Sequence, residues 1–257
     1  MYFYTTKNKT LTIPFEPILF GFKINVHLIL EYLAFFIGFR YYVHLKKRVQ
    51  DLISNENRLS IILGAIVGAF VGSRLIGILE NPIFDIAHYD LAQLLNNKSI
   101  MGGLFGGLLG VEIAKKIINE PNSSGDLFTF PIIIGICIGR VGCFLNGITE
   151  FTYGIETDFL TGMDLGDGLH RHPIALYEIV FLLTLYICLK KAQDNLQKEN
   201  GFTFKLFMIS YFGFRFLIEF IKPNVFHVFG LSTIQWLCII CWIYYFKTIK
   251  KIIKNAC

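Results

Sequence analysis

Long apolar runs separated by short polar stretches dominate the chain. Seven runs approach or exceed the length of about 20 mostly apolar residues that a membrane-crossing helix needs. They cover residues 27–45, 59–79, 100–118, 127–147, 173–190, 203–222 and 230–247. The pattern predicts an all-α, polytopic membrane protein with seven transmembrane helices. We expect residues 1–257 to form one transmembrane domain, with the polar stretch 148–172 as a cap on one side.

Lysine and arginine are distributed unevenly among the polar stretches. Most of them lie after the first, third and fifth apolar runs and in the C-terminal tail. Because cytoplasmic loops of membrane proteins carry an excess of positive charge, this distribution predicts a periplasmic N-terminus and a cytoplasmic C-terminus. The cap at residues 148–172 then faces the periplasm.

The composition supports a membrane location and excludes other classes of protein. Of the 257 residues, 54% are hydrophobic and 17% are charged, whereas soluble domains carry about 25% charged residues. The net charge is +5, but the basic residues stand mostly at the ends of apolar runs, so we expect no nucleic-acid partner. The six cysteines follow no disulfide or metal-binding pattern. We therefore expect neither a cofactor nor a metal.

Most ionisable residues inside the predicted spans lie at one depth, near the periplasmic ends. This layer contains Glu31, Arg74, Arg140, Glu178, Arg215 and Glu219. A charge at the centre of a membrane costs about 2.5–3.5 kcal/mol on insertion scales, and such residues usually mark functional sites. The excess of arginine favours an anionic ligand such as phosphate, which a guanidinium group binds bidentately. A structural ion pair is the alternative, as good for Arg215 with Glu219 and better for Arg74.

Glycines recur at every fourth position in the second and third apolar runs. They are Gly64, Gly68, Gly72, Gly102, Gly106 and Gly110. Such small-residue ridges let two helix backbones approach closely, so packing accounts for most of them. Gly102 and Gly103 also begin a predicted helix at the periplasmic side, where free backbone N–H groups can bind an anion.

Six sequence blocks resemble motifs of the prolipoprotein diacylglyceryl transferase family in order and spacing. They are VGSRLIGIL (71–79), MGGLFGGLLG (101–110), GRVGCFLNGITEFTYG (139–154), RHPIALYE (171–178), YFGFRFLIEFIKPN (211–224) and LSTIQW (231–236). The resemblance implies a seven-helix enzyme of the bacterial cytoplasmic (inner) membrane. Such an enzyme transfers diacylglyceryl from phosphatidylglycerol to the lipobox cysteine of a prolipoprotein. Its expected partners are phosphatidylglycerol and other membrane lipid, and the prolipoprotein signal peptide with its lipobox.

The resemblance also implies roles for individual residues. A cysteine thiolate attacks a glyceryl carbon and glycerol phosphate leaves. Arg140 matches the signature arginine and would bind the phosphate, Arg215 would be a second cation, and Glu219 would orient Arg215. The remaining positions predicted to bind substrate are Asn146, Gly154, Arg74, Gly102, Gly103, Tyr177, Glu178 and Tyr211.

The chain departs from the family's motifs where a proton acceptor is expected. The histidine before the Gly-Gly pair is Met101 here, and the first signature asparagine is Cys143. Glu150 is a displaced counterpart of the signature glutamate, because two residues are inserted before Gly154. The thiol's proton acceptor is therefore open. The candidates are Glu150, His172, Asp164 and Asp167.

Two alternatives follow from these departures. One is a related membrane transferase with a different lipid donor or acceptor. The other is a lipid-binding or transport protein without catalysis. The sequence shows no internal repeat of the kind that many transporters carry, which favours an enzyme.

Overall fold

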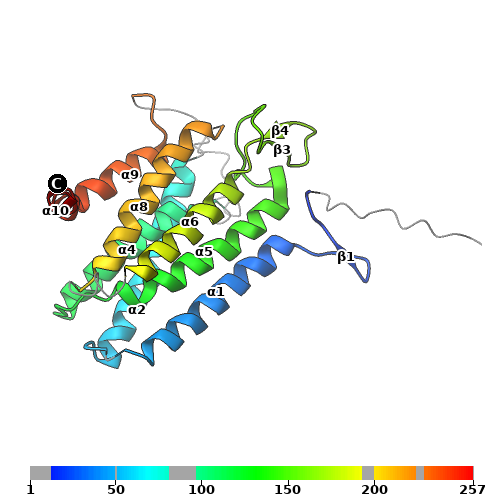
Figure 1. Cartoon of the computed structure of the whole chain (residues 1–257). Coiled ribbons are helices and arrows are strands. Elements are labelled where there is room, and N and C mark those ends of the chain that lie inside the picture. Colours follow the sequence, from blue (N-terminus) through cyan, green and yellow to red (C-terminus); the bar gives the residue numbers. More distant parts are fainter. Residues whose placement is uncertain (1–12, 50, 81–96, 193–199, 224–228, 257) are drawn as a thin grey trace, which may run out of the picture.

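A computed structural model shows the chain as a bundle of helices with two small β-hairpins (Figure 1). It describes residues 13–49, 51–80, 97–192, 200–223 and 229–256. The helices are α1 (Val26–Lys46), α2 (Asn55–Glu80), α4 (Ile100–Ile117), α5 (Asp126–Asn146), α6 (Ile174–Lys191), α8 (Phe202–Ile218), α9 (Thr233–Tyr244) and α10 (Phe246–Ala256). Short 3-10 helices extend α5 over Gly147–Thr149 and α8 over Glu219–Ile221. Residues 1–12, which the predicted orientation places in the periplasm, lie outside the described part.

The hairpins lie in the polar segments next to the helices. Strand β1 (Ile18–Leu19) pairs with β2 (Phe22–Lys23) before α1. Strand β3 (Met163–Asp164) pairs with β4 (His170–Arg171) between α5 and α6, within the predicted cap. Both pairs are antiparallel.

The protein is mostly helical, with several apolar helices, as expected of an all-α membrane protein. Among the described residues, three helices are long and apolar enough to cross a membrane: Val26–Lys46, Asn55–Glu80 and Asp126–Thr149. The seventh apolar run is divided, because α9 ends at Tyr244 and α10 begins at Phe246. The 12 residues of α9 measure about 18 Å at 1.5 Å per residue. The count of seven spans stays a prediction.

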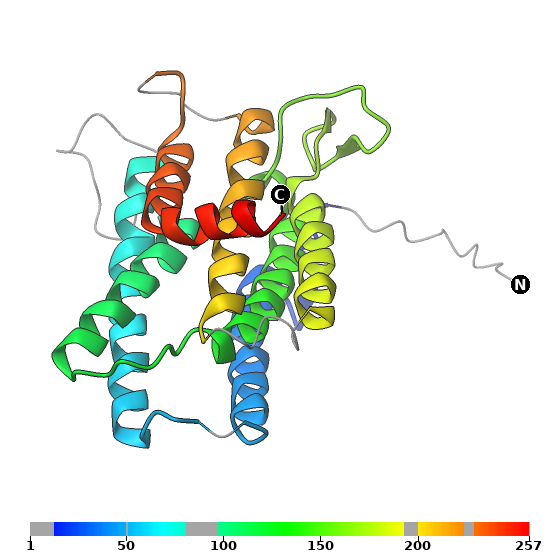
Figure 2. The same cartoon turned by 60° about the vertical axis from the view of Figure 1, so that its left-hand side comes forward.

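The helix ends gather at two ends of the bundle (Figures 1 and 2). The ends of α1, α4 and α6 and the starts of α2, α5 and α8 lie at one end. The start of α1, the hairpin β3–β4 and the start of α9 lie at the other. The basic connections after α1, α4 and α6 therefore share one end, as the charge pattern predicts, whereas the basic helix α10 lies between the two ends (Figure 2).

Close packing of α2 on α4 depends on the glycines that the sequence singled out. A Cβ atom added to Gly68 would lie 2.3 Å from the carbonyl oxygen of Gly106, and one added to Gly72 would lie 2.4 Å from that of Gly102. Real Cβ atoms do not approach backbone this closely, so the two helices meet backbone to backbone. On the opposite side of the bundle, α1 packs along α5.

The most buried part of the core lies around α8. Phe207, Met208, Tyr211 and Phe212 have no exposed surface. Apolar side chains on this face hold α8 in the middle of the bundle, since their burial is the main stabilising term in packing. Arg215 follows Tyr211 by one turn and is therefore carried into a buried position, with only 4% of its surface exposed.

The start of α9 is fixed by a capping box. The Ser232 side chain accepts a hydrogen bond from the Gln235 N–H, and the Gln235 side chain accepts one from the Ser232 N–H. These bonds satisfy backbone donors that a helix start otherwise leaves unpaired. The Gln235 amide also donates to the carbonyl oxygen of Phe216 at 3.2 Å. The start of α9 is thereby attached to the end of α8, beside the buried arginine.

Candidate active site

A single buried carboxylate joins three helices. Glu178 of α6 has no exposed surface. Its Oε1 lies 2.8 Å from Nε of Arg140 on α5, and its Oε2 lies 2.9 Å from Nη1 of Arg215 on α8. The Tyr211 hydroxyl also donates to Oε1. Burying one partner alone would be costly, whereas a paired and hydrogen-bonded set is tolerated. The two arginines predicted to act together are therefore brought to one point.

The network continues from Arg215 toward α2. Nη2 of Arg215 donates to Oε1 of Glu219 at 2.7 Å. Nζ of Lys222 lies 3.6 Å from the same oxygen and 3.3 Å from Oε1 of Glu80, at the end of α2. The Ser232 hydroxyl donates to the other oxygen of Glu219 at 3.5 Å. Cations and carboxylates thus alternate across the end of the bundle that carries the cap.

A cavity of 490 Å³ opens beside this network. Its polar end is lined by His27, Glu31, Glu80, Lys98, Arg140, Cys143, Glu150, Thr152, Arg215 and Lys222. Glu178 and Glu219 are absent from the lining among the described residues, so these two carboxylates lie behind the arginines that they anchor. Four lysine and arginine side chains face three glutamates in the lining. In the lining itself the cations therefore outnumber the carboxylates by one, while Glu178 and Glu219 balance the arginines from behind.

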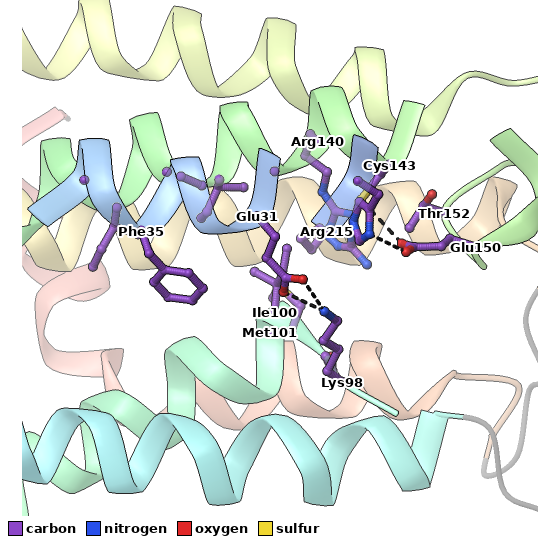
Figure 3. A pocket seen from close by; sticks show the side chains of 18 of the residues that line it. Glu31, Phe35, Lys98, Ile100, Met101, Arg140, Cys143, Glu150, Thr152 and Arg215 are labelled. Carbon is purple, nitrogen blue, oxygen red and sulfur yellow. Dashed lines mark hydrogen bonds and ion pairs between the residues drawn. The ribbon is translucent and has the colours of Figure 1, made fainter. Parts of the chain in front are cut away.

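The rest of the cavity is apolar and is lined mainly by α1 and α5, with Ile62 of α2 and Met101 of α4. Phe35, Phe39 and Tyr42 line it from α1, and Pro131 and Ile132 line it from α5. From His27 to Tyr42 the lining extends over about 22 Å of helix. In Figure 3, Phe35 lies on one side of Glu31 and the labelled arginines lie on the other. A molecule with an anionic head and long apolar chains fits such a cavity.

One ion pair crosses the cavity. Lys98 lies just before α4, and its Nζ is 2.6 Å from both carboxylate oxygens of Glu31 on α1 (Figure 3). The pair is partly exposed, with 43% of the Lys98 side chain and 29% of the Glu31 side chain accessible. It connects α1 to the segment that leads into α4.

A histidine, a cysteine and a glutamate form a second polar cluster in the cavity wall. Nδ1 of His27 lies 2.7 Å from Oε1 of Glu150. Nε2 of the same ring lies 3.6 Å from Sγ of Cys143. The thiol is 3.8 Å from Oε2 of Glu150, and Nη1 of Arg140 is 3.8 Å from the sulfur. The cluster therefore adjoins the arginine network.

The charge state of Glu150 follows from its neighbours. Burial raises the pKa of its carboxyl group, but the hydrogen bond and charge of His27 and the charge of Lys98 outweigh this effect. The pKa of Glu150 is therefore lowered below its ordinary value, and the group is ionised at neutral pH. The donor atoms of His27, Cys143 and Glu150 lie within 4.8 Å of one another, a spacing that a metal ion could bridge. Both ring nitrogens of His27 already have partners within the cluster.

Three of the predicted site residues line the cavity, namely Arg140, Arg215 and Glu150. Three more lie behind the arginines. Glu178 and Glu219 form ion pairs with them, and Tyr211 donates a hydrogen bond to Glu178. All six lie together, and the four that the sequence placed at one depth, Arg140, Arg215, Glu178 and Glu219, form the connected part of the network. Their assignment to catalysis and substrate binding stays a prediction.

Another group of predicted residues lies together under the cap. Nδ1 of His172 is 3.0 Å from the Tyr177 hydroxyl, which also bonds the Thr161 hydroxyl. The N–H of Gly154 donates to the carbonyl oxygen of His172 at 2.9 Å. A Cβ atom added to Gly154 would lie 2.5 Å from Cβ of His172. These contacts explain the glycine by close packing of the cap.

The remaining predicted residues have structural partners. Nη1 of Arg74 donates to the carbonyl oxygen of Asn97 at 3.3 Å. The N–H of Gly103 donates to the carbonyl oxygen of Ser99 at 2.9 Å, and Gly102 lies in the glycine seam with α2. The carbonyl oxygen of Asn146 accepts a bond from the Thr149 hydroxyl at 2.6 Å. Their roles as ligands for substrate stay predictions.

Sequence reasoning missed His27, Lys98 and Lys222 as site residues. A signal existed for each. His27 precedes Glu31 by one helical turn, so the two residues share a helix face. Lys222 follows Glu219 by three residues at the end of α8. Lys98 stands directly before the glycine-rich helix. The sequence pattern was interpreted through the effect of lysines on membrane orientation, so the place of Lys98 and Lys222 in the cavity was not predicted.

The chain is similar to known proteins of one family. A sequence model described as prolipoprotein diacylglyceryl transferase matches residues 17–249. A protein of Finegoldia magna named phosphatidylglycerol–prolipoprotein diacylglyceryl transferase is 28% identical over 229 residues, covering 84% of this chain and 86% of that protein. One of Nitratidesulfovibrio vulgaris strain DP4 with the same name is 32% identical over 203 residues, or 70% of each chain. One of Campylobacter hominis, also so named, is 27% identical over 267 residues, covering 94% and 92%.

Proposed function

The chain belongs to the prolipoprotein diacylglyceryl transferase family, and from this membership and the cavity we propose that it transfers diacylglyceryl from phosphatidylglycerol to a lipobox cysteine. The product is a thioether on a prolipoprotein. The relatives that cover most of the chain carry the corresponding name. Five of the six family blocks fall on elements that contribute residues to the cavity lining, and the sixth, LSTIQW, begins α9.

The amphiphilic cavity is the observation that carries the proposal. A phospholipid needs an apolar space for its acyl chains and cations for its phosphodiester. The apolar faces of α1 and α5 supply the space for acyl chains. Arg140 and Arg215 supply the cations at one end of the same cavity. Glu150, Phe151 and Thr152 of the cap line this polar end, and the hairpin β3–β4 belongs to the same cap (Figure 1). A peptide cysteine arriving from the membrane surface would meet the headgroup there.

The arginines are suited to stabilise the leaving group. The thiolate forms a bond to a glyceryl carbon, the bond from that carbon to the phosphate oxygen breaks, and glycerol phosphate leaves with the electron pair. Negative charge therefore grows on the phosphate in a site of low dielectric constant. Preorganised cations lower such a barrier. Glu178 holds both guanidinium groups in place before the lipid arrives.

The proposal includes a location and an orientation. We place the chain in the bacterial cytoplasmic (inner) membrane, with seven helical segments, the cap in the periplasm and the C-terminus in the cytoplasm. The positive-inside rule supports this orientation, because the basic connections share one end of the bundle. The polar end of the cavity then opens at the periplasmic leaflet, where the lipobox of an exported precursor becomes accessible.

The test is lipid transfer by purified variants in nanodiscs that contain phosphatidylglycerol. A synthetic lipobox peptide gains the mass of diacylglyceryl, and glycerol phosphate appears in equal amount. We expect Arg140→Ala to lose this activity and Arg140→Lys to recover little, because lysine lacks the bidentate fork. Arg40→Ala, at an exposed position of α1, is the control and should behave as wild type.

Two results would overturn the assignment. Near-normal turnover by Arg140→Ala would remove the arginine from the reaction. Transfer by the wild type only from another lipid, such as phosphatidylethanolamine, would establish a different donor. The second result would favour the related transferase that the departures at Met101 and Cys143 left open.

A further inference from the structure

The proposed reaction requires a proton acceptor near the headgroup. The attacking species is the thiolate, and an ordinary cysteine is mostly protonated at neutral pH. Met101 stands where the family's motif has a histidine, and it lines the cavity. A thioether cannot accept a proton at neutral pH. The acceptor in this chain must therefore be another group.

The cap supplies poor candidates. His172 is bonded to Tyr177 and lies outside the cavity lining of the described residues. Asp164 accepts the N–H groups of Gly166 and Gly168 at 2.8 and 3.0 Å and thereby shapes the turn. Asp167 accepts a charged hydrogen bond from Arg171 at 2.7 Å. Hydrogen bonds to these two aspartates lower the pKa of both carboxyl groups, which makes them weaker bases.

We propose that His27 is the catalytic base that takes the proton from the incoming cysteine thiol, and that Glu150 positions it. This inference rests on the proposed function. His27 belongs to the first turn of α1, after the N-cap Asn25, whose side chain accepts the Leu28 N–H at 2.9 Å. Its ring lines the polar end of the cavity.

Glu150 determines which ring nitrogen accepts the proton. The ionised carboxylate of Glu150 is 2.7 Å from Nδ1 of His27, so Nδ1 carries hydrogen and donates it. When the ring is neutral, this bond keeps the hydrogen on Nδ1 and leaves the lone pair on Nε2, as in other sites where a carboxylate orients an imidazole. The base is oriented before the peptide binds. Glu150 is therefore a positioning residue in this scheme.

A sulfur atom already occupies the position in which a substrate thiol would be activated. Sγ of Cys143 lies 3.6 Å from Nε2 of His27, and it lies 3.8 Å from Nη1 of Arg140. One location is thus within reach of both the base and the phosphate-binding cation. Cys143 is not itself the nucleophile, because alkylation would leave a stable thioether on the enzyme. The incoming thiol would bind beside the Cys143 side chain or push that side chain aside.

The step balances in atoms and charge. The substrate sulfur forms a bond to the glyceryl carbon, and its proton passes to Nε2 of His27. The carbon–oxygen bond to the phosphate breaks, and the oxygen keeps the electron pair beside Arg140. The imidazolium is stabilised by Glu150 until product leaves. His27 then returns the proton to water.

Kinetics of His27→Gln test the proposal in the nanodisc assay. Glutamine can retain a hydrogen bond to Glu150 but cannot accept the proton. General base catalysis contributes roughly 10²–10⁴-fold, so we expect kcat to fall by about that factor, with KM for phosphatidylglycerol changed little. His44→Gln, at an exposed position near the other end of α1, is the matched control and should keep wild-type kcat. Thermal unfolding confirms that each variant is folded.

The pH profile separates a base from a structural histidine. In wild type, kcat/KM for the peptide should rise with pH as His27 loses its proton and Nε2 becomes able to accept one. In His27→Gln, the residual rate should rise about tenfold per pH unit up to the pKa of the peptide thiol, because only preformed thiolate reacts. Other ionisable groups face His27 and are unchanged in this variant: Glu31, Lys98, Arg140, Cys143 and Glu150.

The outcomes distinguish this inference from the proposed function. If the wild type fails to transfer diacylglyceryl, the function itself is wrong. If the wild type is active and His27→Gln retains kcat within threefold with an unchanged pH profile, only the base assignment is wrong. Cys143→Ala adds a further test. If it abolishes turnover while His27→Gln does not, Cys143 rather than His27 handles the proton.

Discussion

Glu178→Gln is the most demanding perturbation of the site, because one carboxylate anchors both cavity arginines. Glutamine preserves the shape and can still accept one hydrogen bond, but it removes the charge. The buried Arg140 then loses its carboxylate partner, and Arg215 keeps only Glu219. Removing one partner of a buried ion pair destabilises a protein by about 3–5 kcal/mol. Arg140 and Arg215 are only 6% and 4% exposed, so their ion pairs with Glu178 count as buried.

The predicted consequences for stability and binding differ in sign. A loss of about 3–5 kcal/mol corresponds to a decrease in Tm of roughly 6–20 °C for a chain of this size. Affinity for phosphatidylglycerol should be maintained or increased, because the variant has one negative charge fewer beside the phosphate. The value of kcat should fall at least tenfold, since guanidinium groups without their anchor are no longer preorganised.

The assay combines three measurements on the same nanodisc preparation. Thermal unfolding gives Tm, titration with phosphatidylglycerol gives KM, and the lipobox peptide gives kcat. Glu112→Gln on an exposed face of α4 controls for loss of a carboxylate as such. A Glu178→Gln protein with the Tm and kcat of wild type would refute the reasoning that the shared carboxylate positions the arginines.

Three further predictions concern other parts of the cavity and bundle. Gly106→Ala should destabilise the protein by about 1–3 kcal/mol through overpacking, whereas Gly107→Ala, whose added Cβ meets nothing closer than 3.5 Å, should be tolerated; Tm measures both. Lys98→Met should change KM for phosphatidylglycerol more than kcat, because it removes the ion pair with Glu31 across the cavity. A membrane-permeant maleimide should modify Cys143, and phosphatidylglycerol should slow this labelling; peptide mass spectrometry reads the site.

The helices were predictable because burial in lipid imposes long apolar runs, and each run contains a helix. The break in the last run was not, because apolar residues continue through Tyr245 into α10. What changes there is the periodicity. After Phe246 the lysines recur at helical spacing, so α10 is amphipathic, while α9 is apolar after its first turn. A count of apolar residues alone therefore predicted one helix where the structure has two, the mainly apolar α9 and the amphipathic α10.

The arginine network was predictable in outline. Arg215 and Glu219 lie four residues apart and must share a helix face, and topology placed Arg140 and Glu178 at the same depth. The cluster around His27 was not predictable in this way. His27 and Cys143 are 116 residues apart along the chain, and neither residue type identifies its partner. Only the packing of α1 on α5 brings them together.

The two arginines differ in how they are held, and this difference assigns their parts in the proposed reaction. Arg215 presents Nη1 to Glu178 and Nη2 to Glu219, so both of its terminal nitrogens are engaged by carboxylates. Nε of Arg140 lies 2.8 Å from Glu178 as an ion pair, without a hydrogen bond from its N–H, and Nη1 lies 3.8 Å from Cys143 at the cavity wall. A guanidinium group has five donors in a fixed plane. Anchoring Arg140 through Nε directs its terminal edge toward the ligand, so Arg140 is suited to hold the phosphate. Arg215 fixes Glu178, which in turn fixes Arg140.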